Sequence, residues 1–292
     1  MFDIEENTAK LLKMLEACNV SNKELEYRKT VLEKEHSQPG SIISGISDQY
    51  YNRAHEIKAF YFLKQLGKVS ISEDCSHHAG CDCNLNNSYQ IECVCSSAGK
   101  NGEIAGLCNK QNLKFYVGKY NKLFLLTRFT SSLSEKLRFY NNHKEKGTVD
   151  SSLPYVVFLG LGALANEFFA GENGIEFISM LFGKGNPTLS INADTGCMTP
   201  NGYSHNKVIY NHNSKEINCN IFVSEDYRCM SGIIISAAKL YEEYTIENTW
   251  LFINPEASIK VNPRDFTNIV YWDLYNEHEY GPYLCGEKIE KS

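Results

Sequence analysis

Two acidic residues in the first third of the chain lie where carboxylates are costly unless they bind something. Asp82 precedes the turn-forming run NLNNS, and Glu92 lies in the middle of the apolar run YQIECVCSS. Because a buried carboxylate needs a partner, Glu92 is the strongest candidate for a chemical role. A third acid, Glu56, lies on a predicted helix before them. Three converging carboxylates suit Mg²⁺ or Mn²⁺, which prefer oxygen ligands.

A divalent cation bound by Asp82 and Glu92 would stabilise charge on a phosphodiester and lower the pKa of an attacking water. If these two acids lie on neighbouring strands of a hairpin, both side chains can point to one face. Each acid also has a simpler interpretation. Glu56 would be a surface charge and Asp82 the start of an Asx turn. Glu92 would be satisfied by a structural ion pair with Arg53 or Arg128.

The hydrophobic pattern predicts the elements that position these acids. Helices are predicted over residues 2–36 and 48–66, the second ending at Gly67. The strand KVSIS and a hairpin of DCNLN and YQIECVCS follow. Next come a long amphipathic helix, KLFLLTRFTSSLSEKLRFYNNHKEKG, and a buried strand, PYVVFLGLG. Short strands separated by Asn, Gly and Asp complete the chain. This order predicts an α/β or α+β fold with one mixed central sheet behind a helical extension.

The order of these motifs resembles the PD-(D/E)xK nuclease superfamily, which has the restriction-endonuclease-like fold. That superfamily has a Glu on a helix, an Asp at the next strand and a Glu on the strand after it. Here RAHEIKAFYFLKQLG supplies the helix Glu, and GCDCNLNNSYQIECV supplies the Asp and the second Glu. The following helix and strand look like those that complete its αβββαβ core. The chain is similar, over residues 50–240, to uncharacterised bacterial members. In these an IEAV-type strand replaces Glu-x-Lys, and an Arg-x-x-Ser-x-x-x-x-Lys-like helix follows.

The resemblance implies a metal-dependent nuclease that hydrolyses phosphodiester bonds. It implies catalytic roles for Glu56, Asp82 and Glu92, with Asp82 and Glu92 as ligands of Mg²⁺ or Mn²⁺. The superfamily's lysine is replaced here by Val94, so the positive charge must come from elsewhere. Lys136 on the following helix is the expected substitute and the fourth catalytic residue.

Three further residues are expected to contact a nucleic-acid substrate: Arg128, Ser132 and Lys100. Arg128 and Lys100 are alternative sources of the missing charge. Arg128, Ser132 and Lys136 lie near one face of the predicted helix, although a solvated polar stripe has the same pattern. Two other functions stay open. The chain would be an inactive pseudo-nuclease that binds or regulates, or a host-interacting bacterial protein whose N-terminal helices and cysteines serve a partner.

Composition limits the class of protein and its partners. The chain has 292 residues and a formal net charge of −6, so nucleic acid would be bound by a local basic patch rather than by overall charge. No run approaches the ~20 apolar residues of a membrane helix, and the N-terminus lacks a signal-peptide pattern. We therefore expect a cytoplasmic protein with no membrane partner. The predicted organisation is a helical extension (1–45), a nuclease-like core (46–245) and a packed C-terminal extension (246–292).

The eleven cysteines are expected to be reduced thiols, as is usual in a cytosol. Strand alternation places four of them on the sheet face opposite the acids, buried and metal-free: Cys81, Cys83, Cys93 and Cys95. A zinc site that adds Cys75, Cys108, His77 or His78 is an alternative, but Cys-x-Cys is not the spacing of a zinc knuckle. A nucleophilic pair of Cys75 or Cys95 with His77 or His78 has only proximity to support it.

Overall fold

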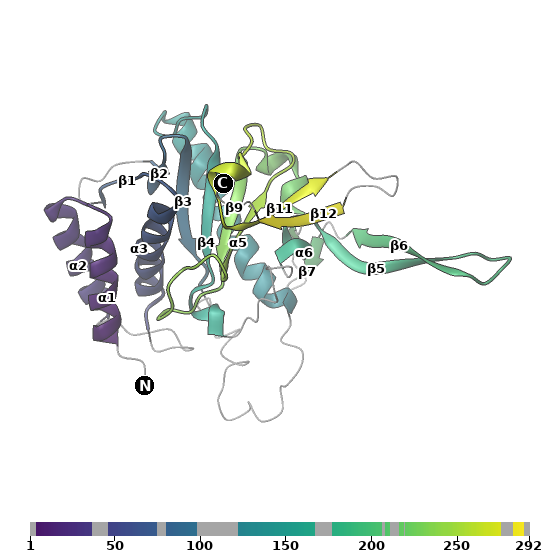
Figure 1. Cartoon of the computed structure of the whole chain (residues 1–292), viewed down its shortest axis with the longest axis horizontal. Helices are drawn as coiled ribbons and strands as arrows, with labels where there is room; N and C mark the ends of the chain where they lie inside the picture. The colour runs from purple at the N-terminus through teal and green to yellow at the C-terminus, as the bar shows by residue number, and fades with distance from the viewer. Residues whose placement is uncertain are drawn as a thin grey trace, which may run out of the picture.

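A mixed eight-stranded sheet forms the centre of the molecule (Figure 1). The computed structural model describes residues 4–36, 46–74, 80–97, 122–166, 177–205, 208–210, 216–218, 220–275 and 283–288. The strands follow the order β1 (Val69–Ile71), β2 (Cys83–Leu85), β3 (Tyr89–Cys95), β4 (Tyr155–Gly160), β9 (Met230–Ser236), β10 (Thr249–Ile253), β11 (Val270–Tyr275) and β12 (Tyr283–Lys288). The pairs β3–β4, β4–β9 and β10–β11 are parallel, and the other pairs are antiparallel.

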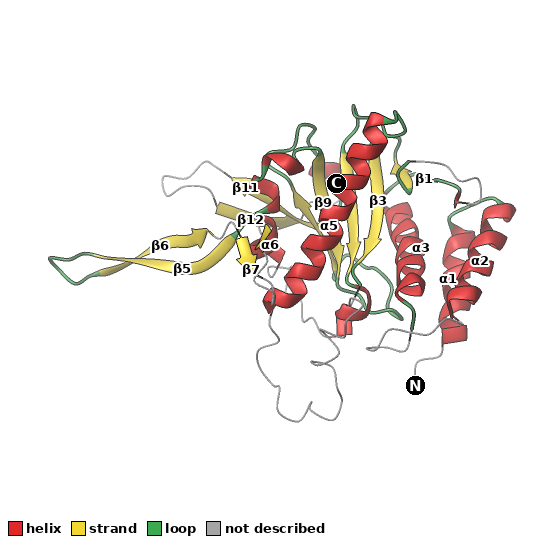
Figure 2. Cartoon of the chain, turned by 180° about the vertical axis from the view of Figure 1, so that it is seen from behind, coloured by secondary structure: helices red, strands yellow, loops and turns green. Residues whose placement is uncertain are grey.

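Helices cover both faces of this sheet, which confirms the predicted α/β class. Helix α3 packs on one face, with α1 and α2 on its outer side, and α5 crosses the other face, where Figure 2 shows it in front of the strands. Their bounds are α1 (Ile4–Ala17), α2 (Asn22–His36), α3 (Asp48–Leu66) and α5 (Lys122–Glu145). The helix predicted over 2–36 is thus two helices, joined at a turn in which Asn19 has a φ of 58°.

Each face of the sheet has its own hydrophobic core. Ile91, Cys93 and Phe158 lie between the sheet and α3, and leucines of α1 pack on the outer side of α3. On the other face, Phe129 of α5 and Val157 of β4 pack in one core with the tryptophan and phenylalanine of β10. Successive residues of β3 and β4 alternate between the two cores, as the period of a strand requires. Because both faces are covered, the central strands are apolar throughout.

The four cysteines near the acids are buried free thiols, as predicted. Cys83, Cys93 and Cys95 pack beneath α3. The placement of Cys81 was wrong, because this residue packs in the core on the α5 side. Cys81 precedes the first paired residue of β2, Cys83, so strand alternation does not extend back to it.

The second half of the chain adds to the same sheet and forms two small ribbons. Residues after 246, predicted as a C-terminal extension, supply β10, β11 and β12. The ribbon of β5 (Lys184–Ile191) and β6 (Met198–His205) projects from the body of the molecule (Figure 1). The smaller elements are β7 (Val208–Tyr210), β8 (Glu216–Asn218), α6 (Ile178–Leu181) and 3-10 turns at Gly162–Asn166, Ile221–Val223, Glu225–Tyr227 and Pro263–Asp265. No helix in the described ranges is long and apolar enough to cross a membrane.

Candidate functional site

A tight turn between β2 and β3 places the two principal acids opposite each other. Three residues, Asn86 to Ser88, lie between the paired residues Leu85 and Tyr89, and the Ser88 amide donates to the Leu85 carbonyl at 3.0 Å. Asn86 and Asn87 have φ values of 56° and 54°, a conformation that asparagine tolerates. The turn fixes Cys83 across from Ile91. The next pair in the same register is Asp82 and Glu92. The predicted hairpin therefore has the register that brings the two acids together.

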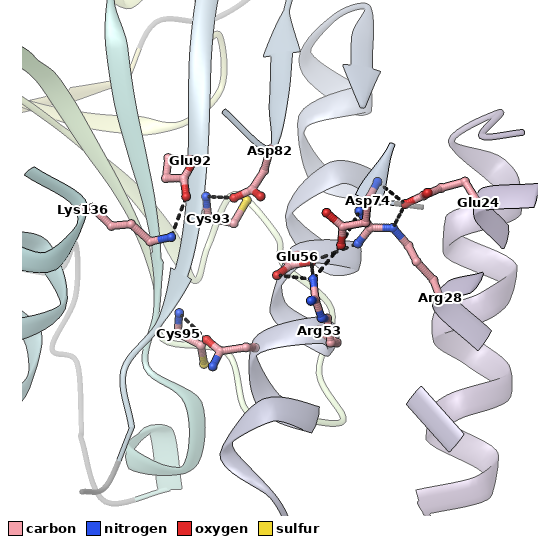
Figure 3. A network of polar contacts seen from close by, with 11 residues as sticks. Glu24, Arg28, Arg53, Glu56, Asp74, Asp82, Glu92, Cys93, Cys95 and Lys136 are labelled. Atoms are coloured by element: carbon pink, nitrogen blue, oxygen red, sulfur yellow. Dashed lines mark hydrogen bonds and ion pairs between the residues drawn. The ribbon is translucent and has the colours of Figure 1, made fainter. Parts of the chain in front are cut away.

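The site lies where β3 continues beyond the end of β2. From Glu92 onward, β3 has no paired residue of β2 beside it, so its amides on that edge need other acceptors. Asp82 Oδ2 accepts from the Cys93 amide at 2.6 Å, and Asn52 Oδ1 of α3 accepts from the Cys95 amide at 3.0 Å (Figure 3). The open edge of β3 thus holds Asp82 beside Glu92.

Glu92 is buried, with 3% of its surface exposed, and its partner comes from the opposite helix. Lys136 Nζ of α5 lies 2.5 Å from Glu92 Oε1 (Figure 3). The expected contact between Lys136 and the acids is therefore present. Val94, at the position of the missing lysine, packs against the hydrophobic core beneath α5. Glu92 does not pair with Arg53 or Arg128, the two partners considered from the sequence.

Burial and neighbouring negative charge disfavour the ionised forms of Asp82 and Glu92. Burial raises the pKa of Asp82 well above its usual range, and the charges of Glu92 and Glu56 raise it further, while Lys136 opposes the shift. Burial also raises the pKa of Glu92, against the attraction of Lys136. Burial lowers the pKa of Lys136, but the negative charges of Glu92 and Asp82 outweigh this effect, so its pKa is raised and the ammonium stays protonated. One lysine serves two buried acids, so the site has an excess of negative charge when both acids are ionised.

Glu56 is held in a separate ion-pair network. Its carboxylate accepts from Arg28 Nη1 at 2.9 Å and from Arg53 Nη1 at 2.9 and 3.1 Å. The same network contains Glu24 and Asp74 (Figure 3). Glu56 nevertheless raises the pKa of both Asp82 and Glu92, so its charge acts on the site.

The residues expected to bind substrate have different positions. Arg128 Nε and Nη2 donate to the carbonyl and hydroxyl oxygens of Ser97, at 2.9 and 3.0 Å. Ser132 Oγ lies 3.2 Å from Ser96 Oγ. Both residues therefore connect α5 to the segment after β3, close to the acids along the chain. Lys100 lies outside the described residues.

The acids of the site meet part of what a divalent cation needs. The described ranges contain no group of three or more His, Cys, Asp and Glu side chains arranged to hold a metal ion. Asp82 and Glu92 provide two carboxylates, and Glu92 Oε2 is a buried oxygen without a hydrogen-bond partner in the described part of the chain. Mg²⁺ commonly binds through one or two carboxylates and retains several waters. The two acids therefore fit such an ion.

Sequence reasoning missed two buried cations, one beside Glu56 and one further along α3. Arg28 of α2 contacts Glu56, although 28 residues separate them. Lys58 of α3 is buried and donates to three backbone carbonyls, at Lys239, Leu240 and Glu242. Both cations lie in helices with many charged residues, and only helix packing distinguishes them from surface side chains. Known proteins give no further guide: no family model, curated protein or solved structure matches the chain.

Proposed function

We propose that this chain is a metal-dependent nuclease of the PD-(D/E)xK superfamily that hydrolyses phosphodiester bonds with Mg²⁺ or Mn²⁺. The observation that carries the proposal is the placement of the Lys136 ammonium 2.5 Å from Glu92 Oε1, on the strand after Asp82. A nuclease of this superfamily needs two carboxylates and a cation at one point, and these three groups meet here. The substrate class is nucleic acid, bound by local rather than overall charge.

The order of elements supports the same proposal. Helix α3 is followed by β1, β2 and β3, then by α5 and β4, which is the αβββαβ order of the restriction-endonuclease-like core. Strands β1 to β4 are consecutive neighbours, and β3 and β4 are parallel across the α5 crossover. In this arrangement the hairpin supplies the acids and the crossover helix supplies the cation.

The protein groups have distinct roles in the proposed reaction. Asp82 and Glu92 would hold the metal ion, and the ion would supply charge stabilisation and an acidified water. The Cys93 amide fixes Asp82 Oδ2, so that carboxylate keeps its orientation. Lys136 would stabilise negative charge that develops on the phosphate, because an ammonium close to the reacting group in a water-poor site acts strongly. Arg128 and Ser132 would contact the nucleic-acid backbone.

A second candidate is an inactive pseudo-nuclease that binds nucleic acid or regulates another protein. Three observations favour it: Val94 replaces the strand lysine, Lys136 is paired with Glu92, and Arg128 and Ser132 are occupied by Ser97 and Ser96. Such a site would keep its fold with ion pairs in place of a metal.

Metal binding is the first test of the proposal. A ligand that binds only the folded state raises the unfolding temperature, so Mn²⁺ should stabilise the wild type. Glu92→Gln removes one charged ligand and should abolish this shift. Glu225→Gln is the matched control, because Glu225 is an exposed glutamate far along the chain. Equal Mn²⁺ shifts in all three proteins would argue against a metal at Asp82 and Glu92.

A further inference from the structure

Glu56 is held by two arginines that differ in accessibility. Arg28 has a side-chain exposure of 4%, and it also binds Glu24 Oε1 through Nε at 2.6 Å. Arg53 has a side-chain exposure of 29%, and its Nη1 is shared between Glu56 and Asp74 Oδ2, the latter at 2.7 Å. Arg28 is therefore fixed inside the protein, whereas Arg53 can be reached from solvent.

The same carboxylate lies on the side of α3 that faces the acids. Figure 3 shows Glu56 between the arginines and the edge of β3, where Asp82 contacts the Cys93 amide. Glu92 Oε2, which is buried and without a hydrogen-bond partner in the described ranges, shows that the site is short of positively charged or donor groups. Glu56 faces this site from α3 (Figure 3) but is bound to two arginines.

We propose that Arg53 restrains Glu56 outside the Asp82–Glu92 site, and that a phosphodiester which draws Arg53 away lets Glu56 join the site as a third carboxylate. This inference rests on the proposed function and adds that the substrate controls the completion of the metal site. Arg53 is then a positioning residue for Glu56 and the first contact of the nucleic-acid backbone. The metal site is completed when substrate is present.

A phosphodiester is a suitable competitor for Arg53. The planar guanidinium forms bidentate, charge-assisted hydrogen bonds with phosphate. In the structure, Glu56 and Asp74 both bind through one nitrogen, Nη1. Arg28 stays with Glu24 when Arg53 leaves, so the network does not collapse. Glu56 Oε2 also accepts from Arg28 Nη1 at 2.9 Å, whereas Oε1 accepts from Arg53 Nη1. Movement of one partly exposed side chain therefore frees Glu56 Oε1, while Oε2 stays with Arg28.

The test is a double-mutant cycle on Mn²⁺ affinity, measured from the EPR signal of free Mn²⁺. The four proteins are wild type, Arg53→Gln, Glu56→Gln and the double variant, with Arg228→Gln as the control. Arg53→Gln should bind Mn²⁺ about tenfold more tightly than wild type, because a freed carboxylate adds a charged ligand. The gain should disappear in the Glu56→Gln background. Arg53→Lys, which keeps the charge but not the fork, should show a smaller gain.

A gain that persists without Glu56 would overturn the inference, because loss of a nearby positive charge would then explain it. A short DNA duplex should raise the Mn²⁺ affinity of wild type more than that of Arg53→Gln, and equal effects would also overturn it. Mn²⁺ binding with no gain in Arg53→Gln contradicts this inference alone. Absence of Mn²⁺ binding in every protein contradicts the proposed function as well. Thermal unfolding of each variant confirms that it is folded.

Discussion

Lys136 Nζ lies 2.5 Å from Glu92 Oε1, although the two residues are 44 positions apart in the chain. The carboxylate is on β3 and the ammonium is on α5, on the face of the sheet that also contains Val94. A lysine on the strand itself would occupy the position of Val94. The long stem of Lys136 brings its charge to the same carboxylate from the neighbouring helix. The Lys136 ammonium thus reaches Glu92 from the helix, while the strand position two residues on is Val94.

Replacement of Lys136 by methionine should separate metal binding from turnover. An ammonium is not a metal ligand, so Lys136→Met should retain Mn²⁺ binding while metal-dependent cleavage is lost. We expect a rate reduction of at least about a hundredfold, the usual effect of removing one charge-stabilising group. Lys144→Met, on an exposed position of the same helix, is the control. Cleavage at the wild-type rate in Lys136→Met would exclude a catalytic role for this lysine.

Arg28→Met should strongly destabilise the fold. It would leave Glu24, which is fully buried, without its guanidinium partner. Loss of one member of a buried pair typically costs about 3–5 kcal/mol, and urea unfolding would measure the change. Arg228→Met is a matched control, because Arg228 is 48% exposed and pairs with exposed glutamates. Such a surface pair contributes at most about 1 kcal/mol. Similar losses for both variants would contradict the account of the network.

Lys58 should make stability depend on pH. Burial lowers its pKa from 10.5 to about 7, although Cys95 and Glu242 oppose the shift. Between these two values the unfolded chain binds more protons at this residue than the folded chain does. The contribution of Lys58 to the free energy of unfolding therefore rises with pH in that window and is constant below it.

The measurement compares wild type with Lys58→Met by urea unfolding at about pH 7.5 and about pH 9.5, inside that window. Other titrating groups, including the buried thiols, are common to both proteins and cancel in the difference. The stability of wild type relative to the variant should increase with pH. A constant or decreasing difference would show that Lys58 keeps its normal affinity for protons in the folded state.

Much of the site was readable from the sequence because local rules determine it. The NNS turn fixes the hairpin register, and the 3.6-residue period of α5 places Lys136 on the side of this helix that faces the sheet. The contact between Arg28 and Glu56 could not be predicted from the sequence, because it depends on how α2 packs on α3. Helix α2 has so many charged residues that Glu24 and Arg28 look like surface positions. Cys81 was misplaced because alternation applies only to paired strand residues.

The contacts of Glu56 show that a sequence pattern can select an acid without predicting which side chains bind it. The pattern selects Glu56, a glutamate on the helix before the hairpin, and α3 carries it on the side that faces Asp82. The pattern carries no information about Arg28 and Arg53, which bind that carboxylate. The partners of an acid decide whether it is a ligand, and they come from helices outside the motif.

Cleavage by the purified protein tests the central claim most directly. The protein is incubated with mixed DNA and RNA in the presence of Mn²⁺, and Glu92→Gln is assayed beside it at equal concentration. Glu92→Gln keeps the shape of the side chain and removes its charge. The account predicts shortened nucleic acid with wild type, no cleavage with Glu92→Gln, and none with EDTA. Intact nucleic acid with wild type, or equal cleavage by Glu92→Gln, would contradict a metal-dependent nuclease at Asp82 and Glu92.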